Sequence, residues 1–97
     1  MGKNIILTGS EGFLGKYIRK ELEKNNFTVI CIDKLNLKKL NYYKCDLSKI
    51  NEIYHTQTRI KKNYKAVDAL INLAAIQIFT DFEKRNVDEI DLMLNVN

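Results

Sequence analysis

Two kinds of apolar pattern alternate along the chain. Short, largely apolar runs rich in β-branched and aromatic residues occupy residues 4–8, 27–32, 42–45 and 67–75, and such runs are typical of strands in a covered sheet. Between them, apolar residues recur every three or four positions, which is the period of an amphipathic helix. The alternation predicts an α/β fold with a parallel sheet of about four strands flanked by helices.

Three helices are expected. The first begins at Gly12 and ends at Asn25-Asn26, because asparagine tolerates the left-handed conformation that closes a helix. The second begins after Ser48, a suitable N-cap, and the third covers residues 87–94. The residues expected to face inward are Leu14, Tyr17, Ile18 and Leu22 in the first helix, Ile50, Ile53, Tyr54, Gln57, Ile60 and Tyr64 in the second, and Val87, Ile90, Met93 and Leu94 in the third.

A glycine-rich turn joins the first strand to the first helix. Gly9, Gly12 and Gly15 are three of only four glycines in the chain. Glycine allows a positive φ and a close approach of another backbone or a ligand, and a helix N-terminus offers unpaired N–H groups to a phosphate. This arrangement indicates the first βα turn of a dinucleotide-binding sheet. The alternative is an ordinary turn between a strand and a helix.

The stretch Thr8-Gly9-Ser10-Glu11-Gly12-Phe13-Leu14-Gly15 resembles the cofactor turn of the extended short-chain dehydrogenase/reductase family, the NAD-dependent epimerases and dehydratases. The resemblance implies a partial Rossmann fold with strand order 3-2-1-4 and NAD as cofactor. It also implies that this turn holds the pyrophosphate, with the cofactor-binding residues Gly9, Ser10, Glu11, Gly12, Phe13, Leu14 and Gly15.

Asp33 ends the second predicted strand, 18 residues after Gly15, close to the roughly 20 expected for an acid that binds the adenosine ribose. A carboxylate there accepts from both ribose hydroxyls and repels a 2′-phosphate, so NAD is favoured over NADP. Lys34, Lys38 and Lys39 lie nearby and partly offset that repulsion. A solvated loop acid is the alternative for Asp33.

Two further segments carry roles that the resemblance implies. Asp46 and Leu47 match an Asp-aliphatic pair that contacts adenine, and Asp46 is equally suited to the turn before the second helix. The segment Asn72, Leu73, Ala74 and Ala75 matches residues beneath the nicotinamide ribose, although any parallel strand can end in alanines. Asn95 matches a family asparagine that supports the active site.

The catalytic residues of the family are not found in this sequence. Its members use a Tyr-x-x-x-Lys pair, whereas none of the five tyrosines here has a lysine four positions later. No metal site or alternative catalytic set is recognised, so we expect a single portion, residues 1–97, truncated before the catalytic region. The sequence predicts the NAD-binding portion of an NAD-dependent epimerase or dehydratase acting on a nucleotide sugar. The alternative is a non-catalytic nucleotide-binding or interaction module.

Composition limits the other function classes. The net charge of +4 comes mostly from scattered lysines without a nucleic-acid-binding module, so we expect no nucleic-acid partner. No apolar run approaches the roughly 20 residues that span a bilayer, and the chain begins almost directly with a strand, so we expect a cytoplasmic protein without a membrane contact. Cys31 and Cys45 are expected in the core and His55 on the surface. The fourth strand, at an open edge, is expected to pair with a second copy or a partner chain.

Overall fold

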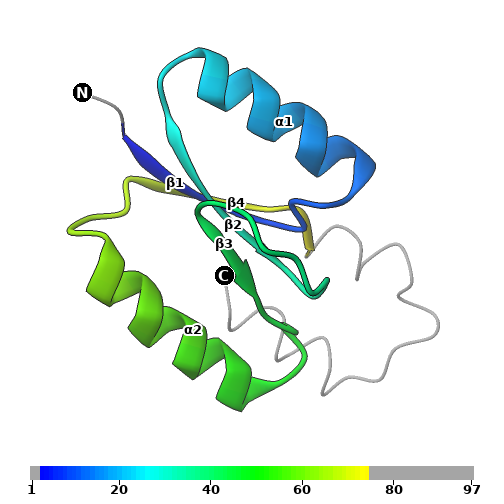
Figure 1. Cartoon of the computed structure of the whole chain (residues 1–97), viewed down its shortest axis with the longest axis vertical. Coiled ribbons are helices and arrows are strands. Elements are labelled where there is room, and N and C mark those ends of the chain that lie inside the picture. Colours follow the sequence, from blue (N-terminus) through cyan, green and yellow to red (C-terminus); the bar gives the residue numbers. More distant parts are fainter. Residues whose placement is uncertain (1–2, 75–97) are drawn as a thin grey trace.

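A computed structural model describes residues 3–74, which form a four-stranded parallel sheet with one helix on each face (Figure 1). The strand order is β3-β2-β1-β4, which confirms the predicted 3-2-1-4 order. The elements in chain order are β1 (Asn4–Thr8), α1 (Phe13–Lys24), β2 (Thr28–Asp33), β3 (Tyr42–Lys44), α2 (Ile50–Asn63) and β4 (Ala69–Asn72).

The core consists of two layers, one on each side of the sheet. On the α1 side, Ile18 and Leu22 pack against a cluster that includes Leu7 of β1 and Cys31 of β2. On the α2 side, Ile60 belongs to a cluster that includes Ile30 of β2. Because successive side chains of a strand point to opposite faces, neighbouring residues of β2 supply both layers. Strand β2 is therefore covered on both faces, as its apolar run predicts.

The ends of the helices follow local chemistry. Asn25 caps α1 and Asn26 adopts a φ of +68°, so the predicted end of this helix is confirmed. The prediction of Ser48 as N-cap of the second helix is wrong, since α2 is capped by Lys49. Ser48 instead donates to Asp46 Oδ1 through both its N–H and its hydroxyl, at 3.0 and 2.7 Å. Ser48 therefore stabilises the turn before α2 and does not cap the helix.

The sheet covers fewer helix residues than periodicity predicts. In α1, Leu14 and Tyr17 are 49% and 62% exposed, although both were expected to face inward. In α2, the same correction applies to Ile50, Tyr54 and Gln57, which are all exposed. Periodicity gives the direction of a side chain, but it does not give the width of the sheet beneath the helix.

The fourth strand is shorter than predicted. It covers Ala69–Asn72 instead of residues 67–75, and Leu73 and Ala74 are already helical. In the described part of the chain β4 pairs with β1 alone, so it lies at an edge as expected. Ala75, the predicted helix over residues 87–94 and Asn95 lie outside the described residues.

Three minor expectations can also be compared with the structure. Cys31 and Cys45 are free thiols, each 2% exposed, which confirms their place in the core. His55 is exposed on α2, as expected. Among residues 3–74, neither helix has the length and apolar character that crossing a membrane requires.

Candidate functional site

The glycine turn at the carboxyl end of β1 depends on residues without side chains. Gly9 has a φ of +69°, in the left-handed region that favours glycine, and its N–H donates to the carbonyl of Ile32 at 2.9 Å. A Cβ on Gly9 would also lie 3.0 Å from the backbone nitrogen of Ala74. The turn thus sits tightly between the ends of β2 and β4.

Gly15 brings α1 against this turn. A Cβ at Gly15 would lie 2.3 Å from the carbonyl oxygen of Gly9, closer than any side chain can approach. The first turn of α1 contains no acidic residue, and no side chain caps its N-terminus at Gly12. The N–H groups at this end are therefore directed at the carboxyl edge of the sheet without a competing negative charge on the helix, which suits an anionic group.

Asp33 lies at the carboxyl end of β2, half-buried beside the glycine turn. Its Oδ2 accepts the N–H of Glu11 at 3.1 Å, and its Oδ1 accepts the N–H of Leu35 at 3.3 Å. A carboxylate offers about four acceptor positions, so two remain for a ligand. The structure thus places the predicted ribose acid in direct contact with the predicted phosphate turn.

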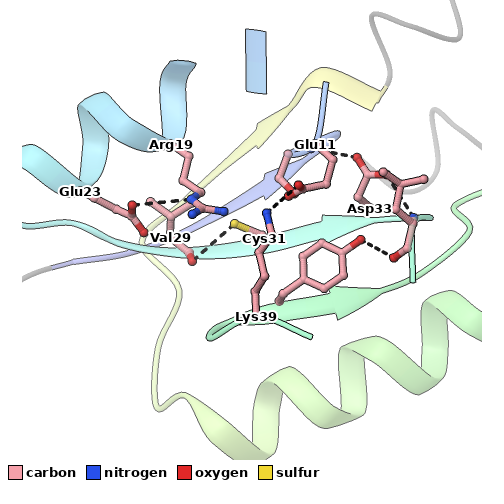
Figure 2. A network of polar contacts seen from close by, with 10 residues as sticks. Glu11, Arg19, Glu23, Val29, Cys31, Asp33 and Lys39 are labelled. Carbon is pink, nitrogen blue, oxygen red and sulfur yellow. Dashed lines mark hydrogen bonds and ion pairs between the residues drawn. The ribbon is translucent and has the colours of Figure 1, made fainter. Parts of the chain in front are cut away.

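Glu11 is the centre of a polar network next to Asp33 (Figure 2). Its side chain is 3% exposed and forms an ion pair with Lys39 at 2.7 Å, while Ser10 Oγ donates to it at 3.1 Å. Burial alone would raise the pKa of the Glu11 carboxyl, but the hydrogen bonds from Lys39 and Ser10 and the nearby positive charges lower it below its ordinary value. Glu11 is therefore ionised at neutral pH, in spite of its burial.

Tyr42 lies close to Asp33 and Glu11. Its hydroxyl donates to the carbonyl of Leu35 at 2.5 Å, which fixes the start of the loop between β2 and β3. Burial, together with the charges of Asp33 and Glu11, raises the pKa of Tyr42 to about 12. The hydroxyl stays protonated and continues to donate at any physiological pH.

The end of β4 is joined to β1 through Thr8. The Thr8 hydroxyl donates to Asn72 Oδ1 and accepts the N–H of Ala74 at 3.3 Å. Leu73 packs against the α1-side core. The predicted nicotinamide segment, as far as Ala74, therefore lies directly against the glycine turn, where Gly9 leaves room for it.

Asp46 and Leu47 lie beyond the end of β3. The hydrogen bonds from the hydroxyl and the N–H of Ser48 lower the pKa of Asp46, and they show that Asp46 shapes the turn before α2. Leu47 packs against the α2-side cluster and lines a groove there. Of the two roles open for Asp46, the turn is observed, and the contact with adenine stays a prediction.

The site thus combines three predicted parts: the glycine turn, Asp33 and the segment that begins at Asn72. Sequence reasoning placed Lys39 only as a nearby charge and gave no role to Tyr42. The ion pair of Lys39 with Glu11 joins residues 28 positions apart, so no local spacing rule could have found it. In residues 3–74, no three His, Cys, Asp or Glu side chains are grouped closely enough to hold a metal ion.

Comparison with solved structures supports this fold. The chain is similar to the aldohexose dehydrogenase of Thermoplasma acidophilum in its ligand-free form, with a TM-score of 0.65 and 22% sequence identity. The match covers 73% of this chain and 29% of that one. At this identity the likeness shows a shared Rossmann-like architecture.

Two curated proteins match most of the chain. One is a decarboxylating sterol-4-alpha-carboxylate 3-dehydrogenase of Dictyostelium discoideum, 29% identical over 100 residues, and the other is an uncharacterised oxidoreductase of Saccharomyces cerevisiae, 23% identical over 100 residues. The matches cover 97% and 95% of this chain, but only 30% and 32% of those proteins. The chain therefore spans about a third of the length of these relatives.

The family model described as short chain dehydrogenase matches residues 3–97, which is nearly the whole chain. This match includes the glycine turn, Asp33 and the end of β4, the same parts that the structure brings together at one edge of the sheet. On this evidence, the chain belongs to the short-chain dehydrogenase family.

Proposed function

We propose that this chain binds NAD, in preference to NADP, as the cofactor-binding portion of an NAD-dependent epimerase or dehydratase of the extended short-chain type. Membership of the family implies a nicotinamide dinucleotide as cofactor. The observation that carries the proposal is the hydrogen bond from the Glu11 N–H to Asp33 Oδ2, which joins the phosphate turn and the ribose acid in one site.

The residues at this edge fit such a cofactor. The left-handed Gly9 and the close contact of Gly15 with Gly9 form a turn in which side chains would obstruct the backbone. In the proposed complex, the backbone from Ser10 to Leu14 holds the pyrophosphate, and Asp33 accepts from the ribose hydroxyls. Asp46 and Leu47 contact adenine, and residues 72–75 lie on the nicotinamide side. The bound cofactor supplies the hydride acceptor.

For the whole protein we propose a nucleotide-activated sugar as substrate class, as the resemblance of the glycine turn implies. The Tyr-x-x-x-Lys pair of the family, in which the tyrosine transfers the proton and the lysine lowers the pKa of the tyrosine, has no counterpart in the printed sequence. The proposed role of these residues is therefore to bind and orient the cofactor, while hydride transfer requires groups that this sequence does not supply.

The proposal is tested by thermal unfolding of the chain with increasing NAD. A ligand that binds only the native state stabilises it by about 2.7 kcal/mol at a hundred times its Kd, which for a chain of this size raises Tm by roughly 10 °C or more. We expect Asp33→Ala to abolish most of this rise, because the ribose loses its acceptor.

The matched control is Glu21→Gln, which also removes one negative charge but lies on the exposed surface of α1 in an ion pair with Lys24. This variant should keep the full response to NAD. A Tm that does not change with NAD in the unmodified chain, under conditions where unfolding is cooperative, contradicts the proposal.

A second candidate is a non-catalytic nucleotide-binding module that associates through β4. The observation in its favour is the exposure of this strand: Leu70 is 43% exposed, and in residues 3–74 the strand has β1 as its one neighbour. This candidate predicts cofactor binding together with a dimeric mass in solution. Exposed sheet edges invite such pairing. Sedimentation equilibrium measures this mass, and a dimeric value favours the module that associates through β4 over a monomeric cofactor-binding portion.

A further inference from the structure

Helix α2 covers one face of the sheet (Figure 1), but a groove of about 640 Å³ lies between this helix and the strands. Its floor includes Ile6, Ile32 and Leu70, which belong to three neighbouring strands. Its wall on α2 includes Tyr54 and Lys61. Tyr54 and Leu70 are 61% and 43% exposed, so apolar side chains of both the helix and the sheet open into this groove.

A segment of the chain outside the described residues has a complementary apolar pattern. In residues 87–94, Val87, Ile90 and Leu94 recur at the spacing that places them on one side of a helix. A helix of this length is marginal in water by itself, and it becomes stable when its apolar stripe is buried against another element. The predicted helix therefore needs an apolar surface to pack on.

The charges of the segment and of α2 are opposite. Residues 87–94 contain three acids and no base, which gives a net charge of −3. Helix α2 contains three bases and one acid, a net charge of +2 (3 − 1) with its histidine counted as neutral. Asp88 and Asp91, three positions apart, share one side of the predicted helix next to its apolar stripe. Lys61 lines the groove and is exposed, so it is suited to pair with an acid on that side.

The connection is long enough for the segment to reach the groove. Residues 75–86, twelve in number (86 − 75 + 1), lie between the last described residue and Val87. Twelve residues span at most roughly 40 Å, whereas the four residues of β4 extend for only roughly 13 Å. The chain can therefore turn back from the carboxyl end of β4 and run along the same face of the sheet.

From these observations we propose that residues 87–94 form an amphipathic helix that docks in the groove between α2 and the sheet. Its apolar stripe packs on Tyr54 and Leu70, and Asp91 lies beside Lys61. The occupant is thus a segment of the same chain, chosen by its apolar spacing, its opposite charge and its reach. The inference does not depend on cofactor binding, so a chain that fails to bind NAD leaves it intact.

The experiment measures hydrogen exchange of the amides in residues 87–94 by mass spectrometry, using the full chain without ligand. We expect these amides to exchange about a hundredfold more slowly than in an unstructured peptide, because docking closes their hydrogen bonds. Ile90→Asp places a charge in the apolar stripe and should remove this protection. The matched control is Leu92→Asp, the same kind of change on the opposite side of the predicted helix, which should keep it.

A second pair of variants tests whether the groove is the docking surface. Tyr54→Ala should speed exchange in residues 87–94 by about tenfold, because the segment loses an apolar contact in the groove. Tyr17→Ala is the matched control, since Tyr17 is 62% exposed on α1, which packs on the other face of the sheet. It should leave exchange in this segment unchanged.

A charge exchange tests the predicted orientation. Lys61→Glu should speed exchange in the segment by about threefold, the size of an exposed ion pair, and adding Asp91→Lys should restore the original rate. Lys62→Glu is the control, because Lys62 is also exposed on α2 but does not line the groove. This variant should change the rate by less than about twofold.

Each outcome supports or overturns the inference. Exchange at the unstructured rate in the unmodified chain overturns it, and so does an equal loss of protection in Ile90→Asp and Leu92→Asp. Protection that increases with protein concentration shows that a second copy supplies the segment, and it also overturns the inference. If Ile90→Asp fails to fold, seen as fast exchange in β1 and β2, Tyr54→Ala decides: a tenfold effect supports docking in the groove, and an unchanged rate overturns it.

Discussion

The carboxyl edge of the sheet and the side of the molecule around β4 differ in how completely they are packed. At the carboxyl edge, Gly9 and Gly15 are in close contact, and the side chain of Glu11 is almost fully buried. Among the described residues, no buried side-chain nitrogen or oxygen lacks a hydrogen-bond partner. The buried side-chain polar atoms of this edge are thus satisfied by residues that the described chain already contains.

The β4 side leaves apolar surface exposed. Val67 and Leu70 are 41% and 43% exposed, and Ile50 and Tyr54 of α2 are 44% and 61% exposed. All four line a groove of about 640 Å³ between α2 and the sheet. Apolar surface gathered in this way is typical of a contact face, and the described residues leave it exposed. The proposed binding edge is thus tightly packed, whereas the apolar side chains around β4 remain partly exposed.

The largest expected effect contrasts the two regions directly. Ile30, in the central strand, is fully buried, so Ile30→Ala should destabilise the chain by about 4 kcal/mol. Leu70→Ala at the edge should cost about 1 kcal/mol when residues 87–94 are undocked by Ile90→Asp, because Leu70 then contacts water in the native state. Urea unfolding monitored by circular dichroism gives both values. A larger loss for Leu70→Ala in the chain that keeps Ile90 would show that the groove is covered in solution.

A somewhat smaller loss is expected from Gly15→Ala, about 3 kcal/mol, which is the upper range for overpacking. The added methyl group would meet the Gly9 carbonyl at 2.3 Å, and both groups belong to the backbone, so neither can move aside without disturbing the turn. The same unfolding measurement applies. Lys16→Ala, at the next and exposed position of α1, should change the free energy of unfolding by less than about 0.5 kcal/mol.

The smallest of these effects concerns how the stability of the carboxyl edge, where Tyr42 lies, depends on pH. The pKa of Tyr42 is raised from 10.0 to about 12, so the folded state keeps the proton that the unfolded state loses first. The stabilisation by the protonated hydroxyl is complete below pH 10 and is lost as the pH rises to about 12, by roughly 2 kcal/mol.

The matched variant for this prediction is Tyr42→Phe, in which the loss of stability between pH 10 and 12 should become smaller. Tyr17→Phe is the control, because Tyr17 is 62% exposed, and it should leave the pH profile as it is. If both variants gave the same profile as the unmodified chain, the hydroxyl of Tyr42 would not be held in the way that the structure shows.

The sequence predicted much of the architecture because it depends on local signals. The four strands were found from their apolar runs and the end of α1 from Asn25 and Asn26, whereas the strand order followed from the family that the glycine turn resembles. The predicted end of β4 was wrong: the strand stops at Asn72, because Leu73 and Ala74 already enter a helix. Apolar character alone does not distinguish the last residues of a buried strand from the first of a buried helix.

The sequence by itself determined which residues bend, which are apolar and which carry charge, and these properties placed the glycine turn and Asp33 at the ends of two neighbouring strands. Only the tertiary structure decided that Glu11 bonds Lys39 and that Leu14 and Tyr17 remain exposed. The physical reason is that turn and strand preferences act between near neighbours in the chain. Burial and ion pairing depend on distances that only the folded backbone defines.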